Sequence, residues 1–93
     1  MIEEDPEAHE LAALRAVWRP PAACRVLEIG AGDGRLTRHY AREVASVIAI
    51  DPDADAIADL RREFPQIDAR AIGVEELSLP DRSVDVVLFA WSL

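Results

Sequence analysis

The sequence predicts an α/β fold in which a parallel sheet carries helices on its faces. Apolar segments of strand length alternate with segments of helical periodicity. The apolar segments are almost continuously hydrophobic, as in strands that are buried on both faces. With 93 residues, of which 51% are hydrophobic, the chain has the length and composition of one small globular domain.

The first predicted element is an amphipathic helix near the N-terminus. Asp5 is a helix-capping residue type, and Pro6 follows it at the first helical position. Apolar residues then recur at helical spacings on one face, namely Leu11, Leu14 and Trp18. Prolines at positions 20 and 21 end the helix, so residues 1–22 are expected to be a helix and proline linker before the main domain at 23–93.

Two strand-loop-helix units follow the linker. Residues 25–29 are expected to form a buried strand and residues 34–44 a helix. The pattern repeats with an apolar strand at 47–50 and a helix at 54–64, which Pro65 ends. Consecutive units of this kind are typical of a parallel sheet.

The remaining segments complete a four-stranded sheet, with a weaker strand at 69–72, a helical turn at 74–77 and a strongly apolar strand at 84–90. Right-handed crossovers place the second strand beside the first and the third outside the second. The last connection is too short to keep winding in that direction, so the fourth strand is expected on the other side of the first. The prediction is a Rossmann-like sheet of order 3-2-1-4, truncated after four strands, with its ligand site at the switch point between strands one and four.

Composition and charge exclude several classes of function. The formal net charge of -8, from 18 acidic and 10 basic residues, repels a phosphate backbone, so nucleic-acid binding is not expected. The single cysteine, Cys24, has no partner in the chain, and no Cys and His residues have metal-ligand spacing. The acidic N-terminus does not resemble a signal peptide, and no apolar run is long enough to cross a membrane. The expected setting is the reducing cytoplasm.

The stretch RVLEIGAGDGRL places glycines at 30, 32 and 34, directly after the first predicted strand and at the start of a predicted helix. Glycine has no Cβ, so this loop can turn sharply and allow a ligand to lie on the main chain. We therefore predict that Gly30, Gly32 and Gly34 belong to a ligand-binding loop. The alternative is a tight turn without a ligand.

Two acids accompany this loop. Glu28 lies near the end of a buried strand, where an unpaired charge is costly, so it is expected to face a cationic group of the ligand or to cap a neighbouring loop. Asp51 follows Gly30 by 21 positions, near the spacing at which an acid meets the ribose hydroxyls of an adenosine cofactor. The alternative for Asp51 is helix capping before Pro52.

The loop departs from the dinucleotide pattern G-x-G-x-x-G. Arg35 stands where the third glycine belongs, and Gly34 comes one place early. Asp33 would add negative charge beside a pyrophosphate, although its plainer interpretation is a helix cap. Both departures disfavour NAD and favour an adenosine cofactor that has a positive centre and no phosphate.

Three consecutive motifs resemble those of class I S-adenosylmethionine-dependent methyltransferases, in particular the type 11 branch: VLEIGAGDG, VIAIDPD and GVEELSLPDRSVDVVLFAWSL. The resemblance covers residues 25–93 and implies S-adenosylmethionine as the cofactor. It implies that the loop at 30–34, Ala31 included, cradles the methionine portion and that Glu28 supports its amino group. By the same resemblance, Asp51 holds the ribose hydroxyls and Pro52 packs near the adenine.

The resemblance also places Val74 and Glu75 along the adenine edge, and Phe89 with Ala90 at the methionine end. Many relatives have an acid where this chain has Gly73, and that acid accepts a hydrogen bond from the adenine amino group. Here Glu75 or a main-chain carbonyl is expected to substitute, unless the contact is missing. The alternative for Glu75 is a position in a solvated turn.

No catalytic residue is assigned, because the cofactor carries an activated methyl group and a base is required only if the acceptor must lose a proton. The sheet of the family is similar to 3-2-1-4-5-7-6, so the chain is expected to be an N-terminal fragment whose fourth strand is an open edge available for association. The expected partner is a small-molecule acceptor. Two alternatives are part of an NAD-dependent oxidoreductase and a non-catalytic binding module.

Overall fold

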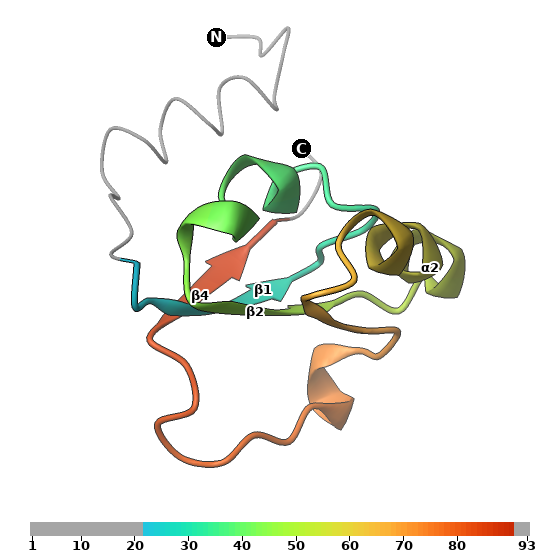
Figure 1. Ribbon diagram of the computed structural model, residues 1–93. Helices are drawn as coiled ribbons and strands as arrows, with labels where there is room; N and C mark the ends of the chain where they lie inside the picture. The colour runs from blue at the N-terminus through green and yellow to red at the C-terminus, as the bar shows by residue number, and fades with distance from the viewer. Residues whose placement is uncertain (1–21, 91–93) are drawn as a thin grey trace, which may run out of the picture.

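The computed structural model describes residues 22–90. That range contains four strands, one α-helix and three short 3-10 turns (Figure 1). In chain order they are β1 (Arg25–Ile29), η1 (Thr37–His39), η2 (Ala41–Glu43), β2 (Ser46–Ile50), α2 (Ala54–Glu63), β3 (Asp68–Arg70), η3 (Val74–Glu76) and β4 (Val86–Phe89). The helix predicted near the N-terminus and the last three residues lie outside the described range.

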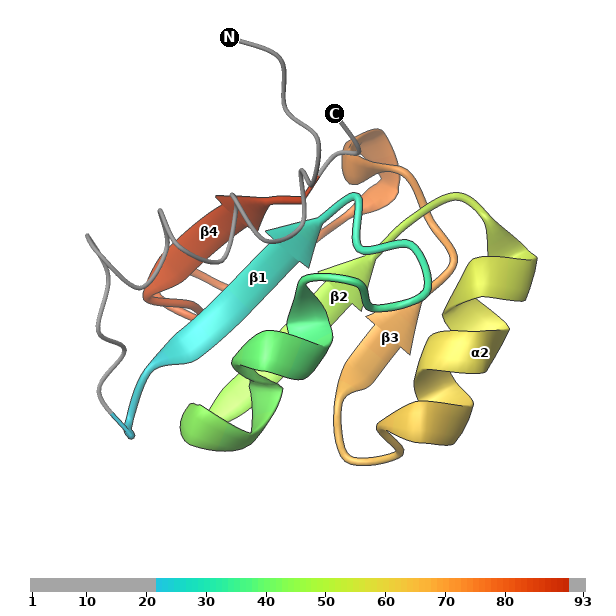
Figure 2. The same ribbon diagram turned by 90° about the horizontal axis from the view of Figure 1, so that it is seen from above.

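The four strands form one parallel sheet in the order β3-β2-β1-β4 (Figure 2). The turns η1 and η2 connect β1 to β2, and α2 connects β2 to β3, so both right-handed crossovers move the chain in one direction. The connection after β3 then returns across the sheet to reach β4 on the other side of β1. The predicted Rossmann-like parallel sheet of order 3-2-1-4 is confirmed.

The sheet has two differently covered faces (Figure 1). The turns η1 and η2 and the helix α2 cover one face, and the connection between β3 and β4 lies on the other. The core fills the space between the sheet and the helical layer. Its buried members include Val26, Val47, Ala49, Ile57, Leu60 and Phe64. Because side chains alternate along a strand, the neighbours of these strand residues point to the face of the β3–β4 connection.

The prediction of a helix at 34–44 is wrong. The structure has two 3-10 turns there instead. Tyr40 separates the turns with φ -132° and ψ -14°, outside the helical region. In a 3-10 turn, residues three apart lie on the same side, and here the hydroxyls of Thr37 and Tyr40 both donate to the carboxylate of Glu28. Apolar periodicity does not reveal this buried polar contact.

The strands at the edges of the sheet are shorter than predicted. β3 ends at Arg70 because its partner β2 ends at Ile50, to which Arg70 is paired. Ile72, which was expected inside this strand, lies beyond the pairing and is free to enter the next loop. β4 likewise covers Val86–Phe89 instead of 84–90, since these four residues pair with the last four residues of β1.

The helix α2 begins where its sequence predicts. The side chain of Asp53 accepts hydrogen bonds from the amides of Asp55 and Ala56, both at 3.1 Å, and so caps the helix. The helix ends at Glu63, two residues before Pro65, which cannot continue it. This helix therefore differs from the expected range 54–64 by one residue.

An ion pair joins the start of β1 to the start of β4. One carboxylate oxygen of Asp85 accepts from the amide of Arg25 at 2.9 Å and from Nε at 3.1 Å. The other oxygen accepts from Nη2 of the same guanidinium at 3.1 Å. The guanidinium and amide hydrogen bonds hold the pKa of Asp85 below its usual value.

The pKa of Asp85 predicts a loss of stability in acid. A lowered pKa in the folded state stabilises the fold above the ordinary value of 3.8, and this contribution is lost as the pH falls through the folded pKa. Asp85→Asn is therefore expected to lower the free energy of unfolding at pH 7, and the difference from wild type should shrink as the pH falls below the ordinary value of 3.8. Urea unfolding of both chains at several pH values measures this difference in the free energy of unfolding. In an Arg25→Ala chain, Asp85→Asn should have a clearly smaller pH-dependent effect, because only the main-chain amide of residue 25 still donates to the carboxylate; an unchanged effect there contradicts the assignment.

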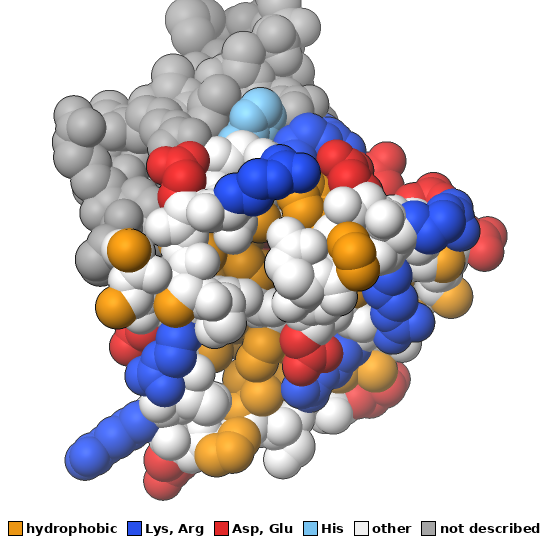
Figure 3. All heavy atoms as spheres, viewed as in Figure 1, with side chains coloured by type: hydrophobic (Ala, Val, Ile, Leu, Met, Phe, Trp, Pro, Cys, Tyr) orange, Lys and Arg blue, Asp and Glu red, His pale blue; other side chains and the backbone are white. Residues whose placement is uncertain are grey.

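The surface carries charges of both signs. Figure 3 shows acidic and basic side chains intermingled on the visible face, with apolar side chains scattered between them. Val74, Val87 and Phe89 are the large apolar residues that are exposed within the described range. In residues 22–90 no helix has the length and apolar character that a membrane span requires.

Candidate functional site

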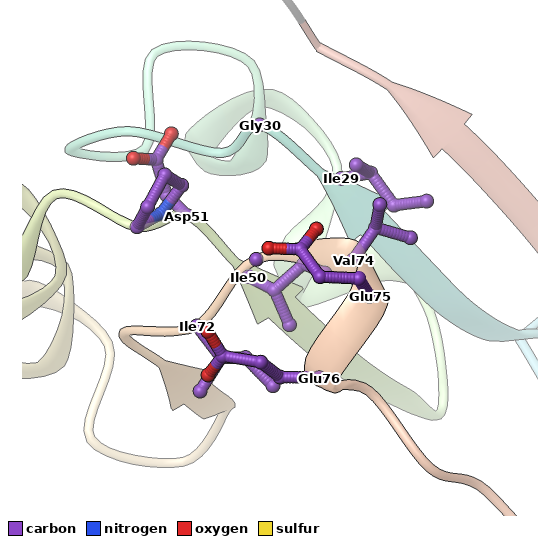
Figure 4. A pocket seen from close by; sticks show the side chains of 10 residues that line it. Ile29, Gly30, Ile50, Asp51, Ile72, Val74, Glu75 and Glu76 are labelled. Atoms are coloured by element: carbon purple, nitrogen blue, oxygen red, sulfur yellow. The ribbon is translucent and has the colours of Figure 1, made fainter.

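A pocket of about 410 Å³ lies at the carboxyl ends of β1 and β2, on the side of the β3–β4 connection (Figure 4). Its walls come from the ends of these two strands and from the segment around η3. The lining residues are Ile29, Gly30, Ile50, Asp51, Pro52, Ile72, Gly73, Val74, Glu75 and Glu76. Parallel α/β sheets bind their ligands at this edge.

None of the residues that line the pocket belongs to β4. The pocket is therefore displaced from the predicted switch point between β1 and β4. The amides of Gly30 and Ala31 both donate to the carbonyl of Ile50, at 2.9 and 3.0 Å, so the loop bends over the end of β2. The pocket lies next to this loop, at the carboxyl ends of β1 and β2.

The lining of the pocket is acidic and apolar. Within the part of the chain that the structure describes, three acids line it, Asp51, Glu75 and Glu76, and no lysine or arginine does. Isoleucines at the strand ends and in the following loop supply the apolar surface. This combination suits a ligand that has an apolar ring, hydrogen-bond donors and positive charge, and it disfavours a phosphate.

Asp51 joins the pocket to the glycine loop. One oxygen of its carboxylate accepts from the amide of Gly32 at 3.0 Å, and the other accepts from the amide of Asp53 at 2.8 Å. The side chain therefore holds the loop against the end of β2. Each carboxylate oxygen has a second lone pair, so the same group can still accept hydrogen bonds from a ligand.

The glycines at 32 and 34 differ in their surroundings, although both have positive φ. A Cβ at Gly32 would have no heavy atom within 4 Å, so the main chain there is open to approach. A Cβ at Gly34 would lie 2.6 Å from Cδ1 of Leu60, so this glycine allows α2 to pack closely against the loop. Gly34 is buried and does not line the pocket.

Glu28 lies on the other face of β1 from the pocket, buried in the core. Its Oε1 accepts a hydrogen bond from the hydroxyl of Thr37 at 2.8 Å and another from the hydroxyl of Tyr40. Burial, and then the neighbouring carboxylate, raise the pKa of Tyr40 above its ordinary value, so the phenol remains a donor. Two hydroxyls therefore donate to the carboxylate of Glu28 in the structure. The sequence predicts a ligand cation or loop amides as its partners instead.

The structure brings together five of the ten predicted cofactor-binding residues as pocket lining: Gly30, Asp51, Pro52, Val74 and Glu75. Gly32 joins them through its hydrogen bond to Asp51. The remaining four, Glu28, Ala31, Gly34 and Phe89, do not line the pocket. Phe89 pairs with Ile29 and is 59% exposed on the same face of the sheet. The binding roles of all ten residues stay predictions.

Sequence interpretation missed three apolar residues of the lining, Ile29, Ile50 and Ile72. The first two are the last residues of predicted buried strands, directly before the glycine loop and before Asp51. That position is a usable signal, since ligands of parallel sheets lie at the carboxyl ends of strands. Ile72 has no such signal, because its place depends on where β3 stops.

Comparison with known proteins agrees with this architecture. The profile of the methyltransferase domain family matches residues 26–93. An uncharacterized methyltransferase from Mycobacterium tuberculosis is 44% identical over 71 residues, which are 76% of this chain and 29% of that protein. A probable S-adenosylmethionine-dependent methyltransferase from the same organism is 41% identical over 63 residues, 68% of this chain and 23% of that protein. The chain thus spans less than a third of these relatives.

Solved methyltransferase structures share the fold. An S-adenosylmethionine-dependent methyltransferase from Mesorhizobium loti superimposes with a TM-score of 0.74 at 25% identity, over 86% of this chain and 38% of that chain. Phosphoethanolamine N-methyltransferase 1 from Haemonchus contortus was solved in complex with phosphoethanolamine and S-adenosylhomocysteine. It superimposes with a TM-score of 0.80 at 25% identity, over 92% of this chain and 19% of that chain. The family profile matches most of this chain, and the chain shares its sheet with these enzymes. The chain therefore belongs to the methyltransferase domain family.

Proposed function

We propose that the chain is the S-adenosylmethionine-binding portion, the cofactor-binding half of the domain, of an enzyme that transfers a methyl group to a small-molecule acceptor. The observation that carries the proposal is the pocket beside the glycine loop, which combines acids with apolar walls. S-adenosylmethionine has a flat apolar ring, hydrogen-bond donors and a cationic sulfonium, so its chemistry matches this lining. Relatives named as S-adenosylmethionine-dependent methyltransferases support the same cofactor.

The residues around the pocket fit such a cofactor. The space beside Gly32 is open, so the methionine portion can lie against the main chain there. The carboxylate of Asp51 lies at the base of the loop and lines the pocket, where it can accept from two vicinal ribose hydroxyls. Pro52 and the isoleucines at the strand ends provide apolar surface for the adenine.

The same lining disfavours a nicotinamide dinucleotide. A pyrophosphate beside the loop would meet Asp51 and Glu75 without a lysine or arginine from the described lining residues. The early position of the third glycine, Gly34, serves the packing of α2 and leaves no glycine at the third position of the dinucleotide pattern. The NAD-dependent alternative is therefore not favoured.

When bound, S-adenosylmethionine supplies a methyl group already activated on its sulfonium. The task of this chain is then to bind and orient the cofactor through the loop at 30–34, Asp51 and the segment around η3. We propose that the acceptor pocket needs further structure beside β4. This strand pairs with β1 alone within the described residues, and Val87 and Phe89 are 45% and 59% exposed. The open edge is thus a place for association.

Calorimetric titration of the 93-residue chain tests the proposed function. S-adenosylmethionine and S-adenosylhomocysteine are expected to bind with one-to-one stoichiometry, whereas NAD should produce no binding heat under the same conditions. The comparison is decisive because NAD and the expected ligands share the adenosine but differ in the pyrophosphate and the sulfur centre. Binding of NAD alone, or of none of the three, contradicts the proposal.

A further inference from the structure

We infer that Thr37 and Tyr40 are positioning residues of the cofactor site, because their hydroxyls tie the end of the glycine loop to the buried carboxylate of Glu28 on β1. These three residues are called the Glu28 cluster below. The inference rests on the proposed function, since the loop is where we place the methionine portion of the cofactor. Neither hydroxyl residue lines the pocket, so both act on the cofactor without touching it.

The Glu28 cluster encloses the glycine loop in the sequence. Oε1 of Glu28 accepts a hydrogen bond from Oγ1 of Thr37 at 2.8 Å and another from the hydroxyl of Tyr40. The two donors follow Glu28 by 9 and 12 residues, so the loop at 30–36 lies wholly between the acceptor and its donors. The end of the loop is thereby tied to the strand from which the loop begins.

The first half of the loop has separate anchors on β2. The carbonyl of Ile50 accepts from the amides of Gly30 and Ala31 at 2.9 and 3.0 Å. The carboxylate of Asp51 accepts from the amide of Gly32 at 3.0 Å. The Glu28 cluster adds a tie at the other end of the loop, to β1 instead of β2. Both ends of the loop are thus held to the sheet.

The Glu28 cluster is fully buried. The exposed fraction is 0% for Glu28 and Thr37 and 1% for Tyr40. Apolar side chains of similar shape fill a core at least as favourably as buried charged or polar groups do. Hydrogen bonds in a buried cluster have defined partners, however, and they specify one arrangement of the chain. The cluster therefore suits the fixing of a loop conformation better than the filling of the core.

A fixed loop matters because the main chain beside Gly32 is open to a ligand. A ligand that requires one loop conformation loses affinity in proportion to the fraction of chains that have this conformation. Loss of one hydroxyl of the Glu28 cluster should lower that fraction. Ligands that reach the loop should therefore bind more weakly, and ligands confined to the adenosine end of the pocket should be affected less.

The test compares S-adenosylhomocysteine with 5′-methylthioadenosine, which lacks the amino-acid portion, by calorimetric titration of the full 93-residue chain. Tyr40→Phe and Thr37→Val each remove one hydroxyl and nearly preserve the shape of the side chain. Each is expected to weaken the binding of S-adenosylhomocysteine by about 10-fold, and that of 5′-methylthioadenosine by less than about twofold. Thr37→Ser keeps a hydroxyl and should bind S-adenosylhomocysteine within about twofold of wild type.

Ile57→Val is the control for a loss of stability. Ile57 is fully buried in α2, outside the Glu28 cluster, and the loss of a buried methylene group should lower the urea midpoint of unfolding. The affinities for both ligands should nevertheless stay within about twofold of wild type, because the loop keeps its anchors.

Amide hydrogen exchange measures the loop without any ligand. The amide of Gly34 donates to the carbonyl of Ala31 within the loop at 3.1 Å, so its exchange rate reports local opening there. This amide should exchange faster in Tyr40→Phe than in wild type and in Ile57→Val. An exchange rate in Tyr40→Phe equal to that of wild type contradicts the inference alone.

The titrations separate the inference from the proposed function. If Tyr40→Phe and Thr37→Val bind S-adenosylhomocysteine as wild type does, or lose affinity equally for both ligands, the inference fails and the proposed function stands. Equal loss in Ile57→Val also contradicts the inference, since the effect is then one of stability. If wild type binds neither ligand, the proposed function and the inference fail together.

Discussion

Gly34→Ala is expected to lower the free energy of unfolding by about 3 kcal/mol, because conformational strain and a steric overlap add at this position. The residue has φ +98°, a conformation that costs an L side chain about 1–3 kcal/mol. The new Cβ would also lie 2.6 Å from Cδ1 of Leu60, which is fully buried in α2. Close packing around Leu60 leaves it little room to move, so α2 would have to shift away from the loop.

Gly32→Ala is the matched control, since it is the same substitution in the same loop. Gly32 has φ +58° but open space around its Cβ position, so its cost should be about 1 kcal/mol, from conformation alone. Urea unfolding followed by circular dichroism measures both losses. In a Leu60→Ala chain, Gly34→Ala should cost clearly less than in wild type. Equal losses at the two glycines, or an unchanged loss without the Leu60 side chain, contradict the packing explanation.

The contrast between these glycines shows what the sequence can and cannot predict in the loop. The spacing of Gly30, Gly32 and Gly34 predicts a turn that side chains would obstruct, and all three indeed have positive φ. It does not tell which glycine faces a ligand and which faces a helix. That distinction depends on where α2 packs, which is a property of the tertiary structure.

The order of the sheet is predictable because each step uses a strong local signal and a general rule. Continuous apolar runs identify β1, β2 and β4, and Pro65 ends α2 before β3. Right-handed crossovers then leave one arrangement for the four strands. The bounds of β3 are less predictable, because a strand ends where its neighbour stops pairing.

Glu28 shows why side-chain partners are the least predictable part of the site. Its burial follows from its place in an apolar strand, and so does the need for hydrogen-bond donors. Which donors satisfy it depends on the conformation of the segment after the loop, where Thr37 begins η1 and Tyr40 directly follows that turn. The spacing of apolar residues in that segment predicts a helix instead, since it carries no information on this polar contact.

Asp51→Ala is expected to weaken the binding of S-adenosylhomocysteine by at least about 100-fold. The substitution removes the proposed acceptor of the two ribose hydroxyls, and each hydrogen bond to a charged group is worth about 1.5–3 kcal/mol. It also releases the amide of Gly32, which Asp51 holds at 3.0 Å, so the loop loses the contact that fixes it to β2. Calorimetric titration of the purified chain measures the affinity.

Asp53→Ala is the control that separates cofactor binding from stability, because Asp53 lies two residues away and carries the same charge. Its side chain caps α2 through the amides of Asp55 and Ala56 and does not line the pocket, whereas its own amide still donates to Asp51. This variant should lose about 1 kcal/mol of stability and keep its affinity within about twofold. If Asp51→Ala and Asp53→Ala bind S-adenosylhomocysteine equally well, Asp51 serves only to join the glycine loop to β2.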